Sequence, residues 1–228
     1  MGLGLLDWQT PGIWLLFSMV GGLTLLLMRP LLSPTWQEAL KMVRWLLLPY
    51  TGLLLGGLSP RLLGLTNLDW LASLGLGLGL VFALLLLLGL VRATTEPTAM
   101  PGLQSNLQPG PDSSTVTTTL YGLIHRGAQE FHWCFLRGAL WEFIYRSPTP
   151  PSLIAYWAIW LAALLAAPEA IGGQSSAAHR LLALLTLLAT SVLFLYTRNF
   201  WLCWLLHAAA WLIVNPQRET GYRIRDTG

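Results

Sequence analysis

The chain has 228 residues, of which 54% are hydrophobic and only 10% are charged. A soluble domain carries about 25% charged residues, so this composition excludes a soluble globular protein and predicts an integral membrane protein. The formal net charge is +3. The basic residues fall mostly in linkers and in the tail, which is typical of a topology signal and not of a nucleic-acid-binding surface. The lipid bilayer is therefore the expected partner, and no nucleic acid is expected.

Apolar runs recur along the chain, and most of them are long enough to cross a hydrocarbon core of about 30 Å as a helix. Breaks at Pro, Gly and charged residues divide these runs into predicted spans. An amphipathic segment, 33–45, lies between the first and second spans, and its Ser33 and Glu38 mark a helix start. The expected fold class is all-α, a polytopic transmembrane helix bundle of about seven spans: 13–32, 45–65, 68–91, 117–145, 153–167, 178–196 and 199–214.

One long polar segment divides the chain. Thr, Pro, Gly, Ser, Asn and Gln dominate it, and such residues bury too little apolar surface to offset the entropy of ordering, so we expect a flexible linker. The predicted organisation is an N-terminal three-span membrane half (1–92), the linker (93–116), a four-span membrane half (117–214) and a basic tail (215–228).

The distribution of Lys and Arg predicts the orientation, because cytoplasmic loops are enriched in both. With seven spans and the N-terminus outside, one side of the membrane receives far more basic residues than the other. We therefore expect the N-terminus outside and the C-terminus on the cytoplasmic side. The inner residues are Arg29, Lys41, Arg44, Arg92, Arg126, Arg180, Arg218, Arg223 and Arg225, and the outer residues are Arg61, Arg146 and Arg198.

Ionisable residues within spans indicate pairing or function, because a charged group at the centre of a membrane helix costs at least about 2.5–3.5 kcal/mol. Segment 117–145 carries most of them. On a helix, Glu130 and Arg137 share one face with Cys134 and Trp141 through i, i+4, i+7 and i+11 spacing. Either this face holds a structural ion pair or it forms part of a site. Similarly, His207 is either a core histidine bonded to a polar neighbour or a ligand or catalytic group.

Other reactive side chains have simpler interpretations. His179 and Arg180 follow a Gly- and Ser-rich stretch and are interpreted as a loop-to-helix junction at the membrane interface. Cys134 and Cys203 match neither a zinc motif nor a disulfide framework, and we interpret them as buried small apolar residues.

Two segments carry a resemblance to a known family. Residues 135–140, Phe-Leu-Arg-Gly-Ala-Leu, resemble the Phe-Arg-Gly segment of the CPBP family, the CAAX-protease and bacteriocin-processing membrane proteins. Residues 197–201 and the helix bearing His207 resemble the last motif of that family. The resemblance covers residues 119–214. It implies a membrane-embedded, metal-dependent peptidase fold that uses Glu-Glu-x-x-x-Arg, Phe-x-x-x-His and a final His followed four residues later by Asn.

The chain departs from this pattern at most functional positions. With Arg137 as the motif arginine, the glutamate pair is replaced by His132 and Trp133, and the final Asn by Trp211. The segment 160–167 contains no His for the middle motif, and Ser replaces Phe four residues before His179. The family pattern therefore lacks both its water-activating carboxylates and a complete set of metal ligands.

The sequence thus predicts a CPBP-like, catalytically degenerate protease homologue that serves as an accessory or assembly subunit of a membrane complex, with other membrane proteins as partners. The alternative is an active CAAX-type intramembrane metallopeptidase with a rearranged site. Its candidate catalytic residues are Glu130, His132, Arg137 and His207, and its candidate metal ligands are His132 and His207. No cofactor is expected, and zinc would be required only by the peptidase alternative. A transport function is disfavoured, because a pathway needs polar faces on more than one helix.

Overall fold

The computed structural model describes residues 8–94, 115–172 and 177–214, and throughout these ranges the chain forms helices joined by turns. The predicted linker and the basic tail fall largely outside the described residues. Seven helices follow one another: α1 (Pro11–Met28), α2 (Pro34–Leu54), α3 (Trp70–Thr94), α4 (Thr115–Tyr145), α5 (Ile154–Gly172), α6 (Ala177–Thr197) and α7 (Phe200–Val214). The expected all-α helix bundle is confirmed.

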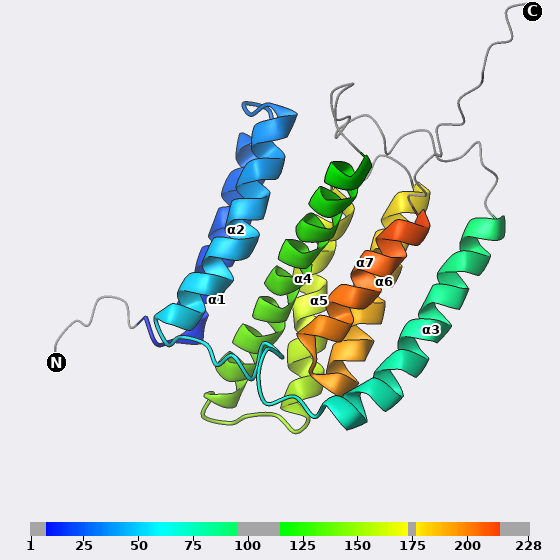
Figure 1. Cartoon of the computed structure of the whole chain (residues 1–228). Coiled ribbons are helices and arrows are strands. Elements are labelled where there is room, and N and C mark those ends of the chain that lie inside the picture. The colour runs from blue at the N-terminus through cyan, green and yellow to red at the C-terminus, as the bar shows by residue number, and fades with distance from the viewer. Residues whose placement is uncertain (1–7, 95–114, 173–176, 215–228) are drawn as a thin grey trace, which may run out of the picture.

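The helices form a row of neighbouring pairs. The α1–α2 hairpin packs on α4, which pairs with α5, and α4 and α5 pack in turn on α7 and α6. Helix α3 packs on α6 and α7 and lies at the edge away from α1 and α2 (Figure 1). Helix α3 follows α2 in the sequence, but the four C-terminal helices separate it in space from α1 and α2.

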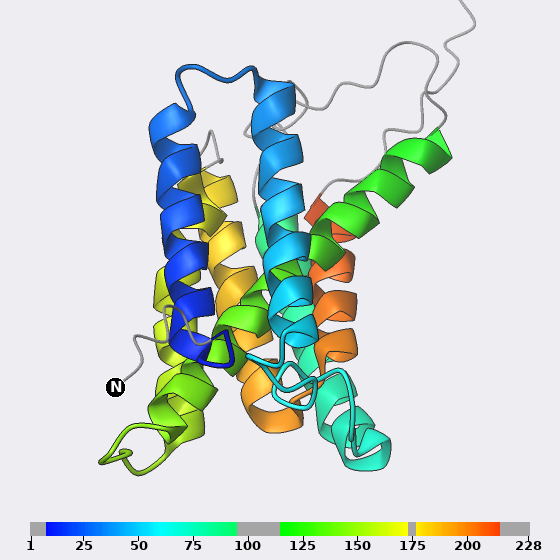
Figure 2. The ribbon, with the colours of Figure 1, turned by 90° about the vertical axis from the view of Figure 1, so that its left-hand side faces the viewer.

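Helix α4 is the centre of the bundle. It has 31 residues, which gives a length of roughly 46 Å at 1.5 Å per residue. Because a hydrocarbon core is only about 30 Å thick, a helix of this length fits by tilting. Figure 2 shows α4 crossing obliquely behind the upright α1 and α2. This crossing lets α4 contact α1, α2, α5 and α7.

Four helices are long and apolar enough to cross a membrane: α1, α5, residues 70–87 of α3 and residues 179–197 of α6. Helix α7 is equally apolar but shorter, whereas α2 and α4 carry several charged residues. Small side chains on α5 permit close approach of its neighbours, as in other membrane bundles. The buried residues are Ala158, Ala162, Ala163, Ala166 and Ala170.

Two expected helix breaks are absent. The amphipathic segment and the start of the second span form one helix, α2, which begins after the Ser33 cap and continues through Pro49. Helix α5 likewise continues through Pro168 to Gly172 instead of ending at residue 167. Proline is tolerated within membrane helices because neighbouring groups satisfy the carbonyl that it leaves without a donor. Helix α2 ends at Leu54, so the second predicted span was too long at its C-terminal end.

The segment between α2 and α3 fixes the start of α7. Gly64 has a φ of +72°, and its carbonyl accepts a hydrogen bond from the backbone N–H of Phe200 at 3.0 Å. Asn199 then caps α7, because its side-chain oxygen accepts the N–H groups of Trp201 and Leu202 at 3.0 and 3.3 Å. These contacts fix the position at which α7, the helix that carries His207, begins.

Candidate functional site

The central feature of the site is an ion pair within α4. Glu130 and Arg137 lie two turns apart on one helix face, and Arg137 Nη1 donates to Glu130 Oε1 at 2.8 Å. Both side chains are almost completely buried, with 0% and 1% relative exposure. The pair expected from the i, i+7 spacing is therefore present.

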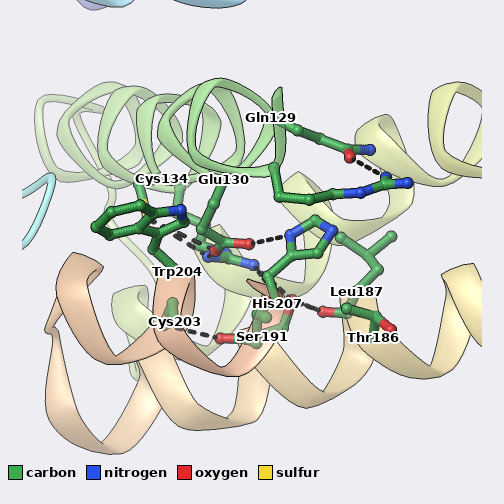
Figure 3. A network of polar contacts seen from close by, with 12 residues as sticks. Gln129, Glu130, Cys134, Thr186, Leu187, Ser191, Cys203, Trp204 and His207 are labelled. Atoms are coloured by element: carbon green, nitrogen blue, oxygen red, sulfur yellow. Dashed lines mark hydrogen bonds and ion pairs between the residues drawn. The ribbon is translucent and has the colours of Figure 1, made fainter. Parts of the chain in front are cut away.

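Helix α7 brings His207 to the same carboxylate. The Nδ1 atom of His207 lies 3.1 Å from Glu130 Oε2, as Figure 3 shows. A carboxylate only accepts hydrogen bonds, so the proton in this contact belongs to Nδ1. Trp133 stacks on the imidazole with ring centroids 4.9 Å apart and an interplanar angle of 18°. The hydrogen bond to Glu130 at one edge and the Trp133 ring against one face thus fix the orientation of the His207 imidazole.

Helix α6 satisfies the other side of the guanidinium. Arg137 Nη2 donates to the hydroxyls of Thr190 and Ser191 at 3.0 and 3.2 Å. The guanidinium carbon lies 5.2 Å from the centroid of the Phe194 ring. The two cysteines line this network, and both are fully buried. Helices α4, α6 and α7 are therefore joined through the Glu130–Arg137 pair, whose arginine cannot lose its charge.

A second polar cluster lies on the opposite side of α4, between α1, α2 and α5. One carboxylate oxygen of Glu169, on α5, accepts hydrogen bonds from Arg44 and from Trp45, both on α2. Its other oxygen lies 3.8 Å from His132 Nε2. The same imidazole nitrogen is 3.4 Å from Ser18 Oγ on α1. This cluster joins four helices through groups from each of them.

The polar contact between α2 and α4 continues toward the start of both helices. His125, two turns before His132, lies 3.5 Å from a carboxylate oxygen of Glu38. Its ring also meets the edge of Trp45 at 5.2 Å between centroids. Polar faces are thus present on α2 and α5 as well as on α4, although the sequence indicated only the last.

The candidate residues do not assemble into one site. Glu130, Arg137 and His207 come together, but His132 faces the other side of α4 and contacts Ser18 and Glu169 instead. Zinc sites need three or four converging ligands, and a guanidinium against the carboxylate opposes a further cation. Within the described ranges, no three His, Cys, Asp or Glu side chains are grouped to hold a metal ion. The residues around Glu130 and His207 therefore do not fit the zinc site that the resemblance implies.

The remaining candidates take structural positions. Trp141 packs its ring against Arg198, whose guanidinium carbon lies 4.4 Å from the ring centroid. His179 lies in the first turn of α6 and is 5% exposed, so it is buried in the bundle at that end.

Sequence reasoning missed Glu169 and Arg44 as parts of a partly buried cluster. Glu169 follows Pro168, which was expected to lie beyond the end of its span, and Arg44 was counted as a charge on the inner side of the membrane. A signal was present, because Glu38, Lys41 and Arg44 recur on one face of an amphipathic helix. The hydroxyls of Thr190 and Ser191 were also detectable as polar residues within an apolar run.

No family model, curated protein or solved structure matches this chain. The function of the site is therefore argued from its geometry and from the sequence motifs.

Proposed function

We propose that this chain is a CPBP-like membrane protein without protease activity, and that it acts as an accessory or assembly subunit of a membrane complex. One observation carries the proposal: Arg137 and His207, from the two family-like segments, both bind the Glu130 carboxylate. Both oxygens of Glu130 are engaged, one by Arg137 and the other by His207. These groups connect α4, α6 and α7.

This pairing favours a structural role for Glu130. A general base must be within hydrogen-bond reach of a water molecule or a substrate. Glu130 is 0% exposed, and its oxygens accept hydrogen bonds from two donors. Removing the carboxylate would leave the buried guanidinium of Arg137 without the one counter-ion that the described residues offer it, which is costly inside a membrane bundle.

The accessory role is supported by fold-level analogy and by the outer surface. Large apolar side chains cover the outward faces of the helices at the two edges of the row, including Leu23 and Leu27 of α1 and Phe82 and Leu86 of α3. Such faces suit lipid and the helices of other membrane proteins alike. We also propose that the N-terminus lies outside and the C-terminus in the cytoplasm, since the basic residues favour this orientation.

Purification of the tagged chain in mild detergent, followed by identification of co-purifying membrane proteins, tests the proposal. We expect wild type and Glu130→Gln to retain the same partner in the same ratio, because Gln keeps the size of the side chain and an acceptor for Arg137. An inactivated protease accumulates its substrate instead. A protein held by Glu130→Gln but absent from wild type would therefore contradict the subunit proposal.

Peptidase activity is the second candidate function, and one observation favours it. The contact between Glu130 and His207 unites a carboxylate five residues before the first family-like segment with the imidazole of the second. This function would require further ligands that the geometry does not supply. Metal analysis of the purified chain distinguishes the two candidates: stoichiometric zinc that is lost in His207→Ala would establish the peptidase, whereas the subunit proposal expects none.

A further inference from the structure

A chain of polar side chains runs along the interface between α2 and α4. It begins at Glu38, in the second turn of α2, whose side chain is 30% exposed. One carboxylate oxygen of Glu38 accepts a hydrogen bond from Lys41 Nζ at 2.7 Å, and the other lies 3.5 Å from His125 Nε2 on α4. The side chain of His125 is only 13% exposed, so this contact leads from the edge of the interface toward its interior.

The contacts continue two turns further along both helices. The ring of Trp45 lies 5.2 Å from that of His125 between centroids, and its Nε1 donates to Glu169 at 2.5 Å. The other carboxylate oxygen of Glu169 lies 3.8 Å from His132 Nε2. Trp45 follows Glu38 by seven residues in α2, which is two turns or roughly 10.5 Å of helix. His132 follows His125 by the same interval in α4. The contacts thus extend from a partly exposed carboxylate to an imidazole that is 1% exposed.

Three nitrogen atoms along this chain of contacts are buried without a hydrogen-bond partner in the described part of the structure: His125 Nε2, His132 Nδ1 and Arg44 Nε. The separations of 3.5 and 3.8 Å between the two imidazoles and the carboxylates are longer than ordinary hydrogen bonds. Buried polar groups nearly always have a partner, and ordered water supplies it where side chains do not. The three atoms therefore indicate bound water between α2 and α4.

We infer that ordered water molecules bind between α2 and α4 and connect Glu38 with the buried His132, which gives protons a route from the end where α2 begins to the centre of the bundle. Water suits the site because it donates to a carboxylate or an imidazole nitrogen and accepts from a guanidinium. Glu and His side chains in series within membrane helices are typical of proton relays. The objection to a pathway, that polar residues lie on a single helix, does not hold here, because α2, α4 and α5 all contribute. The inference does not depend on whether the chain is an accessory subunit or a peptidase.

The exchange of imidazole N–H protons with water tests the route. In detergent-solubilised protein with isotope-labelled histidine, NMR transfer of magnetisation from water measures this exchange, and each of the four histidines is assigned through the signal that its phenylalanine variant removes. His207 is the matched control: it is 4% exposed, slightly more than His132, but it is hydrogen-bonded directly to Glu130 at 3.1 Å. Exchange at His132 should be several-fold faster than at His207, because the inferred water reaches only His132. Equal or slower exchange at His132 would overturn the inference.

Closing the route at its exposed end provides a second test. Glu38→Leu should slow the exchange at His132 several-fold and leave the exchange at His207 unchanged. Glu142→Leu is the matched control and should affect neither, since Glu142 is also a partly exposed carboxylate that pairs with a basic residue of its own helix. An unchanged rate at His132 in Glu38→Leu would contradict a route through this end. Both variants leave the contact of His132 with Glu169 in place, so they test the route even if His132→Phe fails to fold and His132 is assigned by elimination.

Discussion

Glu130 is a single buried carboxylate shared between a guanidinium and an imidazole. Arg137 has further acceptors in the hydroxyls of Thr190 and Ser191, whereas Glu130 is the only carboxylate with which it forms a salt bridge within the described residues. The loss of Glu130 and the loss of Arg137 should therefore have unequal effects on stability. Removing the carboxylate leaves a permanent buried cation without that counter-ion, while removing the arginine leaves Glu130 still bonded to His207.

This asymmetry predicts the order of stabilities in a double-mutant cycle. Glu130→Ala should lower the free energy of unfolding by about 3–5 kcal/mol, as breaking a buried ion pair does in soluble proteins. Arg137→Leu should cost less, because a carboxyl group can take up a proton and lose its charge. The double variant should be milder than the sum of the two. Thermal unfolding in detergent measures these effects, and strictly additive values would show that the two residues do not interact.

At the scale of helices, two polar clusters, one fully and one partly buried, hold neighbouring helices against opposite sides of α4. The Glu130 network fixes α6 and α7, and the Glu169 cluster fixes α1, α2 and α5. Apolar packing alone discriminates poorly between helix rotations, because lipid tails and leucine side chains are similarly apolar. Directed contacts to Arg137 and Glu169 therefore specify which face of each helix turns inward.

The position of α7 also depends on the close approach of Gly64 to the α6–α7 turn. An added Cβ at Gly64 would lie 2.5 Å from the carbonyl oxygen of Arg198 and 2.9 Å from the Phe200 nitrogen. Gly56 has a similar φ of +74° but nothing within 4 Å. Gly56→Ala should therefore show only the cost of a left-handed backbone, about 1–2 kcal/mol, and Gly64→Ala should cost clearly more. Melting temperatures of the two variants compare them, and equal losses would mean that this turn is not tightly packed.

For the whole molecule, the number of crossings decides where the termini lie. The proposed seven crossings would put the N-terminus and C-terminus on opposite sides of the membrane, and the predicted linker on the same side as the predicted tail. Within the described residues, four helices have the length and the apolar composition of a membrane span. Helices α2, α4 and α7 lie alongside them in the bundle (Figure 1). The charged groups of α2 and α4 are compatible with crossing because several of them are paired inside the bundle.

Cysteine-accessibility labelling in intact cells checks this topology. Ser105→Cys and Asp226→Cys should be protected from a membrane-impermeant reagent, and Thr66→Cys, in the turn between α2 and α3, should react. The two natural cysteines, Cys134 and Cys203, are each 0% exposed and should give little background. Labelling of positions 105 and 226 from opposite sides would contradict the seven-span arrangement.

The sequence by itself determined that the protein is surrounded by lipid and that its secondary structure is helical. With so few charged residues, the outer surface must be apolar, and satisfying every backbone group inside a bilayer requires helices. The spacing of Glu130 and Arg137 also placed both residues on one helix face, where a pair between them was one of the alternatives. The helix ends were less well determined at Pro49 and Pro168, since tolerance of proline depends on neighbouring helices.

Only the tertiary structure decided which helices meet. The partnership of His207 with Glu130 joins residues 77 positions apart, and that of Arg44 with Glu169 joins residues 125 apart. No local periodicity encodes such contacts. Helix geometry alone places Glu130 and His132 on opposite sides of α4, because they are two residues apart. Only the packing decided which helices cover those two sides and which groups each residue meets. The polar clusters of this protein are thus a consequence of how the helices pack around α4.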